Sequence, residues 1–185
     1  MNSGKIFVIS GPSGVGKGTI AAGLLKNPQL NFCWTKSYTT RPERASDKSE
    51  NHYIFTSEKQ FKKLEKTGEI IESNFYNDQW YGSSKSEIDQ ALVNGKNVLK
   101  EVEVNGGVAM KKIYPQVVLI FIKNDLETIK NRLIKRGQNT PTEIEERLKT
   151  AQKELEFEKF YDYSVTNPEG HPEKAIGKVE KIITK

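Results

Sequence analysis

Short apolar runs and amphipathic stretches alternate along this chain of 185 residues. The runs at 6–9 and 117–122 have the length and composition of strands buried on both faces of a parallel sheet. Helical periodicity follows each run, in 18–26 and in the residues after Asp125. This alternation predicts an α/β fold, with a parallel sheet and helices on both faces.

The middle of the chain, about 35–88, differs in character from the rest. It is rich in Tyr, Ser, Thr, Asn and charged residues, and it predicts short strands, turns and one helix at 57–67. After the turn at 94–95, the run 96–104 predicts a further strand. Because α/β folds bind ligands over the carboxyl ends of their strands, we expect the polar segment to be an insertion over those ends.

Capping signals set the bounds of the elements in the last third of the chain. A helix is expected at 125–137, where a glycine follows the last helical residue. Thr140 and Glu143 have the spacing of a capping box and predict the start of the next helix. A short strand at 163–165 and a helix from about Glu173 complete the prediction.

A glycine-rich segment, GPSGVGKGT, joins the first strand to the first helix. It fits the GxxxxGK pattern, in which backbone N–H groups and a lysine surround the phosphates of a nucleotide. The positive end of the following helix adds to this attraction. An ordinary glycine-rich turn is the alternative. The predicted P-loop consists of Gly11, Pro12, Ser13, Gly14, Val15, Gly16, Lys17, Gly18 and Thr19.

Gly18 stands where the common form of this motif has Ser or Thr, and Thr19 comes one place late. A hydroxyl ligand for Mg²⁺ is therefore missing at that position, which disfavours the metal arrangement usual in GTPases and ATPases. The sequence instead suits a kinase that holds Mg²⁺ mainly through phosphates and waters, with Lys17 on the outer phosphates.

Composition narrows the class of protein. The chain is 35% hydrophobic and 29% charged, and none of its apolar stretches approaches the roughly 20 residues of a membrane span. Its net charge of +5 suits nucleic acid or small polyanionic substrates. No RNP-like motif, zinc finger or unbroken basic run is present, so small polyanions are favoured, and neither nucleic acid nor a membrane is expected as a partner.

Cysteine and histidine usage indicates the compartment. Cys33 is the single cysteine, so no intrachain disulfide can form, and we expect a packed side chain there. The start of the chain does not have the pattern of a signal peptide. Together these features predict a cytoplasmic location. His52 and His171 are far apart in the sequence, which predicts no structural metal site.

Two groups of arginines suggest contacts with phosphate. Arg41 and Arg44 lie three residues apart in a polar loop, SYTTRPER, where their planar donors would match phosphate oxygens; a solvated basic loop is an equal alternative. Arg132 and Arg136 share one face of a helix, and Arg147 lies at the edge of the next helix's apolar face. The three resemble a lid that closes on phosphates, the alternative being helix-surface charge.

The insertion also holds side chains that suit a purine nucleotide. The hydroxyls of Tyr53 and Tyr81 can bind a phosphate that arginines also hold, and Ser83 lies in the turn WYGSS. The carboxylate of Glu72 can accept two hydrogen bonds from guanine, N1–H and N2–H, a donor pair that adenine lacks. Taken singly, each of these residues is more simply explained as a surface or packing residue.

These motifs, in this order and at this spacing, resemble those of the guanylate kinases over nearly the whole chain. The resemblance rests on GPSGVGKGT, SYTTRPER, HYIF, IIE, WYGSS, NVLKEVEVNG, NRLIKRG and EERL. It implies one P-loop kinase domain that transfers the γ-phosphoryl of ATP to GMP with Mg²⁺, giving ADP and GDP. It also implies a core of 1–34, 89–125 and 150–185, a GMP-binding insertion at about 35–88 and a lid at about 126–149.

The resemblance implies a role for each matching position. GMP is expected to contact Ser37, Arg41, Arg44, Tyr53, Glu72, Tyr81, Ser83 and Glu103. The residues expected to act on the transferred phosphoryl are Lys17, Arg41, Arg132, Arg136 and Arg147. The P-loop is expected to bind ATP, with Asn167 near the adenine.

The chain departs from the family pattern in three places. Glu103 and Asn105 replace an aspartate and a glutamine in a strand motif near the guanine and the metal-bound water. Lys100 stands where an apolar residue is usual, and Pro168 stands where an aspartate is common. None of these changes touches the P-loop, Glu72 or the arginines, so activity is still expected.

Three other functions are alternatives, and features of the sequence argue against each of them. A guanylate-kinase-like module that only binds partner proteins would lack a working P-loop, whereas Lys17 and its glycines are intact. A GTPase would carry an NKxD motif and a hydroxyl directly after Lys17, and the chain has neither. A kinase acting on a sugar phosphate would not need the residues that recognise a base, among them Glu72.

Overall fold

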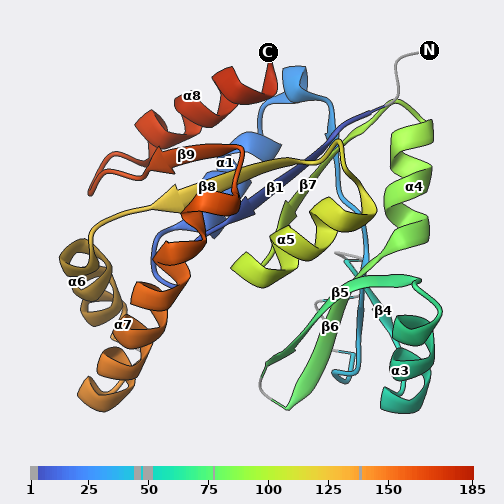
Figure 1. Ribbon diagram of the computed structural model, residues 1–185, viewed down its shortest axis with the longest axis horizontal. Helices are drawn as coiled ribbons and strands as arrows, with labels where there is room; N and C mark the ends of the chain where they lie inside the picture. The colour runs from blue at the N-terminus through green and yellow to red at the C-terminus, as the bar shows by residue number, and fades with distance from the viewer. Residues whose placement is uncertain (1–3, 44–46, 48–51, 77, 138) are drawn as a thin grey trace.

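The computed structural model describes residues 4–43, 47, 52–76, 78–137 and 139–185. Within these ranges, five parallel strands form a central sheet in the order β2-β7-β1-β8-β9 (Figure 1). The strands are β1 (Ile6–Ser10), β2 (Phe32–Cys33), β7 (Asn97–Glu101), β8 (Val118–Lys123) and β9 (Tyr163–Thr166). The sheet confirms the predicted parallel α/β architecture.

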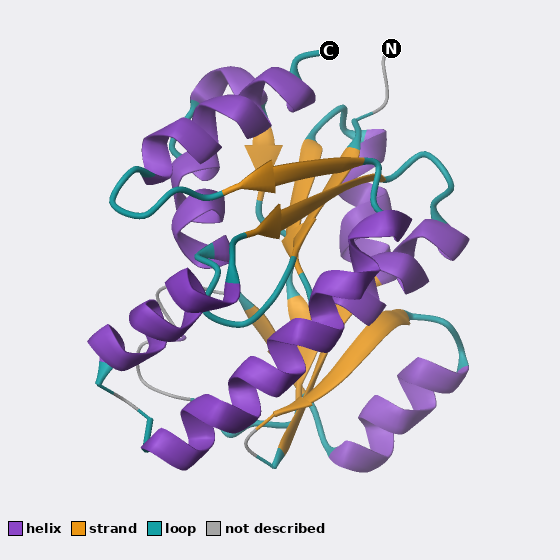
Figure 2. Ribbon diagram, turned by 60° about the vertical axis from the view of Figure 1, so that its left-hand side comes forward, coloured by secondary structure: helices purple, strands orange, loops and turns teal. Residues whose placement is uncertain are grey.

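Helices cover both faces of this sheet (Figure 2). On one face, α1 (Lys17–Leu25) and α8 (Pro172–Ile183) bury their apolar sides against residues such as Phe7 and Ile9. On the other, α4 (Lys85–Val93) and α5 (Val104–Ile113) pack against the alternate residues of the same strands. The continuous apolar run of β1 is therefore explained, because all five of its residues are buried between two helical layers.

The polar middle of the chain forms a second, four-stranded sheet. Its order is β4-β3-β6-β5, with β3 and β4 parallel and the other pairs antiparallel. Its elements are β3 (Ser37–Thr39), β4 (Tyr53–Phe55), α3 (Glu58–Lys66), β5 (Ile70–Tyr76) and β6 (Gln79–Ser84). The predicted helix in this segment is confirmed, since the Ser57 side chain caps α3 by accepting from the N–H of Gln60.

The remaining helices, α6 (Leu126–Arg136) and α7 (Pro141–Leu155), pack on each other at the lower left of Figure 1, with the second sheet at the lower right. Asp125 caps α6, and Gly137 ends it in the left-handed conformation, as predicted. The capping box of Thr140 and Glu143 is also present. Short 3₁₀ turns occupy Pro28–Leu30 and Glu156–Phe160.

The prediction of a strand at 96–104 is wrong at its end. Strand β7 stops at Glu101, and α5 begins at Val104. The alternation of apolar and charged residues would continue a strand, but β1 ends at Ser10, one residue after the Ile9–Glu101 pair. The N–H of Val102 still donates to the carbonyl oxygen of Ile9, and within the described ranges residues beyond Val102 have no partner on β1. The chain turns instead, and Val102 in the turn and Val104 at the start of α5 are both buried. Among the described residues, no helix combines the length and the apolar character needed to cross a bilayer.

Candidate functional site

The predicted P-loop wraps the end of β1 and leads directly into α1. Gly11 and Gly16 have φ of 142° and 96°, a region that side chains with a Cβ rarely adopt. Neighbouring atoms exclude a larger residue as well, since a Cβ on Gly11 would lie 2.0 Å from the carbonyl oxygen of Ile122. A Cβ on Gly16 would lie 2.5 Å from Nδ2 of Asn167. Both glycines are therefore required by the shape of the loop.

Lys17 is the first residue of α1, and its amine turns back over the loop. Nζ donates to the carbonyl oxygens of Gly11 at 2.6 Å and of Pro12 at 3.2 Å. Burial lowers the pKa of Lys17, and the charges of Glu101 and Glu154 oppose this change. The amine lies at the mouth of the loop, next to the place where phosphates would bind.

Arg132 and Asn167 converge on the backbone of the P-loop. The carbonyl oxygen of Val15 accepts from Arg132 Nη1 and from Asn167 Nδ2, both at 2.8 Å. Arg132 also donates to the carbonyl oxygen of Asn167 at 2.9 Å and to Glu169 Oε2 at 2.6 Å. These bonds fix the loop, a supporting role that the sequence analysis did not assign to either residue. Asn167 Oδ1 is buried without a hydrogen-bond partner among the described residues.

The other two predicted lid arginines also lie at the P-loop. Arg147 Nη1 donates to Ser13 Oγ at 3.4 Å. Arg136 lines a second cavity, of about 280 Å³, together with Gly16 and Asn167. Arg136 is near enough to Lys17 for its charge to contribute to lowering the pKa of that lysine. Three arginines that are up to fifteen positions apart in the sequence thus surround one loop.

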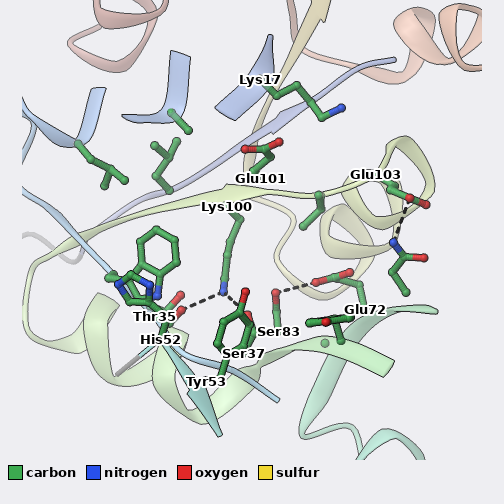
Figure 3. Close-up of a pocket in the computed structure, with 18 of the residues that line it drawn as sticks. Lys17, Thr35, Ser37, His52, Tyr53, Glu72, Ser83, Lys100, Glu101 and Glu103 are labelled. Atoms are coloured by element: carbon green, nitrogen blue, oxygen red, sulfur yellow. Dashed lines mark hydrogen bonds between the residues drawn. The ribbon is translucent and has the colours of Figure 1, made fainter. Parts of the chain in front are cut away.

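A larger cavity, of about 470 Å³, extends from the P-loop to the second sheet (Figure 3). Lys17 and Glu101 lie at one end of the view, and Glu72 and Ser83 lie at the other. Most residues predicted to contact GMP line this space, namely Ser37, Tyr53, Glu72, Tyr81, Ser83 and Glu103. The cavity therefore connects the glycine-rich loop with a set of polar side chains, and its volume lies in the range of small-molecule sites.

Glu72 is the carboxylate at the far end of this cavity. Its Oε1 accepts from Ser83 Oγ at 2.6 Å (Figure 3). Burial raises the pKa of Glu72, while the Ser83 hydrogen bond and the charge of Lys100 act in the opposite direction. A buried carboxylate with oxygens facing a cavity favours a ligand that brings hydrogen-bond donors.

Arg41 is held by a partner that the sequence analysis missed. Its guanidinium pairs in fork geometry with Asp47, through two N–O distances of 2.8 Å, and this hydrogen-bonded pairing raises the pKa of Arg41. The guanidinium also stacks near the rings of Tyr53 and Phe55, at 5.1 and 5.4 Å from their centroids. Asp47 occupies the two donors that a phosphate would use. Arg44 lies outside the described residues.

Glu103 faces the second sheet rather than the P-loop. Its Oε1 accepts from Asn74 Nδ2 at 3.0 Å, across the mouth of the large cavity (Figure 3). Glu103 is also the residue before α5, without a side-chain hydrogen bond to that helix. The Glu103 side chain is longer than the aspartate of the family pattern, and it reaches from the central sheet to the insertion.

Comparison with known proteins agrees with this arrangement. The sequence profile of the guanylate kinase family matches residues 3–185. The chain belongs to the guanylate kinase family. Among its relatives, the guanylate kinase of Listeria innocua is 36% identical over 97% of this chain and 87% of its own. That of Mycoplasma genitalium is 38% identical over 98% of this chain and 76% of its own.

A solved structure of the same family has the same fold. The crystal structure of guanylate kinase from Anaplasma phagocytophilum superposes with a TM-score of 0.72 at 26% identity, covering 100% of this chain and 86% of the other. The similarity therefore spans the core, the insertion and the two helices α6 and α7.

Proposed function

We propose that this chain transfers the γ-phosphoryl of ATP to GMP, giving ADP and GDP. Its membership of the guanylate kinase family supports this activity. The observation that carries it is the cavity that joins Lys17 of the P-loop to the partly buried carboxylate of Glu72. One end suits the phosphates of ATP, and the other suits a base with two adjacent N–H donors.

Phosphoryl transfer between two nucleotides requires alignment and positive charge more than covalent chemistry. In this proposal Lys17 and the P-loop N–H groups hold the β- and γ-phosphates of ATP. The phosphate of GMP replaces Asp47 in the fork of Arg41 and accepts from Tyr53 and Tyr81. No protein base is needed, because the attacking phosphate oxygen is already an anion. Arg136 and Arg147 stabilise charge on the moving phosphoryl.

Mg²⁺ fits the carboxylates near Lys17. A Cβ on Gly18 would lie 3.5 Å from Glu101 Oε2, so a carboxylate oxygen borders the place where other P-loops have a hydroxyl. Oxygen ligands and retained waters are what Mg²⁺ prefers. Glu101 would hold the hydrated ion, and bound Mg²⁺ would neutralise charge on the phosphates. The residues that bind GMP and ATP, and the cytoplasmic location expected from the sequence, remain predictions.

The substrate is tested by measuring ADP release with GMP, AMP, UMP and ribose phosphates as acceptors. We expect GMP to be used with a kcat/KM far above the others. Equal use of ribose phosphate would instead indicate a sugar-phosphate kinase. Binding of GMP without ADP release would indicate a module that has lost catalysis.

The position of Arg136 leads to a prediction about the lid. Arg136 lies beside the P-loop and away from the cavity end that holds Glu72. We expect Arg136→Ala to lower kcat by about 100-fold, because a cation aimed at developing charge is lost, and to change GMP affinity little. Steady-state kinetics with calorimetric GMP binding test this, with exposed Lys130→Ala on the same helix as the control. A loss of GMP affinity at normal kcat would instead show that Arg136 acts in the GMP site.

A further inference from the structure

Lys100 is a buried cation in the wall of the large cavity. It lies on β7 between two buried valines, Val98 and Val102, and its residue exposure is only 7%. Both valines pack in the apolar cluster beneath α4 and α5. An apolar side chain would fill this place without the cost of burying charge. Packing alone therefore does not explain a lysine here.

The ammonium of Lys100 points into the corner of the cavity next to Ser37 (Figure 3). Nζ donates to the carbonyl oxygen of Thr35 at 3.2 Å and to Ser37 Oγ at 3.4 Å. Because an ammonium can only donate, Ser37 Oγ is the acceptor, and its own proton is left to be donated elsewhere. The hydroxyl of Thr35 is buried without a hydrogen-bond partner among the described residues and lies on the same cavity. In this corner the Ser37 hydroxyl therefore has a proton to donate to a ligand.

The charge opposite Lys100 is the carboxylate of Glu72. Among the groups that act on Lys100, Glu72 contributes most after burial, yet the two do not form an ion pair within 4.0 Å. Lys100 and Glu72 thus place a donor corner and an acceptor carboxylate on the wall of one cavity. Guanine presents a matching edge, with the 6-oxo acceptor beside the N1–H and N2–H donors. Adenine presents an amino group in place of the oxygen.

We infer that Lys100 is a specificity-determining residue, which directs the Ser37 hydroxyl and a positive charge at the 6-oxo group of guanine while Glu72 binds N1–H and N2–H. This inference rests on the proposed function. Lys100 acts by orienting the Ser37 hydroxyl and by its positive charge, so it is a positioning residue. The cation favours a carbonyl oxygen and repels the amino group of adenine.

Substrate analogues give a direct readout of how the base is recognised. 6-Thio-GMP keeps both N–H donors but has a weak acceptor in place of the 6-oxo group, and IMP keeps the 6-oxo group but lacks the 2-amino donor. We expect Lys100→Met to weaken GMP binding by about 10- to 100-fold and to reduce the preference for GMP over 6-thio-GMP. The preference for GMP over IMP should stay unchanged. Calorimetric Kd values at neutral pH measure both ratios.

Folding and general damage are controlled separately. We expect Lys100→Met to raise the melting temperature of the free protein at neutral pH, because the buried charge is removed. Lys96→Met, at an exposed lysine just before β7, should behave as wild type in every assay.

Three outcomes decide the inference. A reduced preference for GMP over 6-thio-GMP, with unchanged KM for ATP, supports it. The inference is overturned if Lys100→Met binds GMP and 6-thio-GMP as tightly as the wild type does. It is also overturned if Lys100→Met loses affinity equally for all three acceptors and for ATP. In either case the role of Lys100 is structural. Failure of the wild type to bind GMP would instead contradict the proposed function itself.

Discussion

Replacing Glu72 with alanine is expected to abolish the selective use of GMP. Glu72 is buried, and its carboxylate already accepts from Ser83 at one oxygen. AMP would leave this carboxylate facing the unprotonated N1 of adenine, so the wild type should prefer GMP by about 10⁴-fold in kcat/KM. Glu72→Ala removes the acceptor. The preference for GMP should then largely disappear, because kcat/KM for GMP falls while that for AMP changes little. The measurement is kcat/KM for both nucleotides in both proteins.

Two further measurements sharpen this prediction. Glu72→Gln should also be poor, since its amide offers one acceptor oxygen and places an N–H donor against a donor of the base. In the wild type, kcat/KM for GMP should decline with acid from a pH above 4.5, because burial raises the pKa of Glu72. Exposed Glu145→Gln serves as the control. A Glu72→Ala protein that still selects GMP would show that the base is read elsewhere.

Replacing Lys17 is expected to stop phosphoryl transfer while the fold survives. The amine contacts only carbonyl oxygens of the P-loop, Gly11 and Pro12, among the described residues. Lys17→Met keeps the length of the side chain and removes its charge, so kcat should fall by about 10²- to 10³-fold or more. GMP binding should change little, since Glu72 lies at the other end of the cavity.

The control for this prediction lies on the same helix. Lys26→Met changes an exposed lysine at the end of α1 and should leave turnover and melting temperature unchanged. Circular dichroism and thermal unfolding of Lys17→Met separate a chemical defect from a folding defect. Near-normal turnover in a folded Lys17→Met protein would exclude Lys17 from the mechanism.

Local sequence was sufficient for the parts of this protein that depend on near neighbours. The P-loop, the Asp125 cap, the capping box at Thr140 and the buried strands β1 and β8 were all predicted correctly. Each depends on backbone conformations or hydrogen bonds within a few residues, or on the burial pattern of one segment. The sequence therefore determined the order of strands and helices along the chain and the position of the glycine-rich loop.

The tertiary structure alone decided features that join distant residues. Arg132 and Asn167 reach the Val15 carbonyl across 117 and 152 positions of sequence, and no local pattern indicates that bond. Strand β7 ends within one residue of the end of its neighbour β1, which the alternating pattern at 96–104 could not reveal. Lys100 reads as one lysine in a charged stretch, yet the sheet, α4, α5 and the insertion enclose it. Its burial, and hence its altered pKa, exists only when these elements pack together, because desolvation depends on the atoms that surround a group in space and not along the chain.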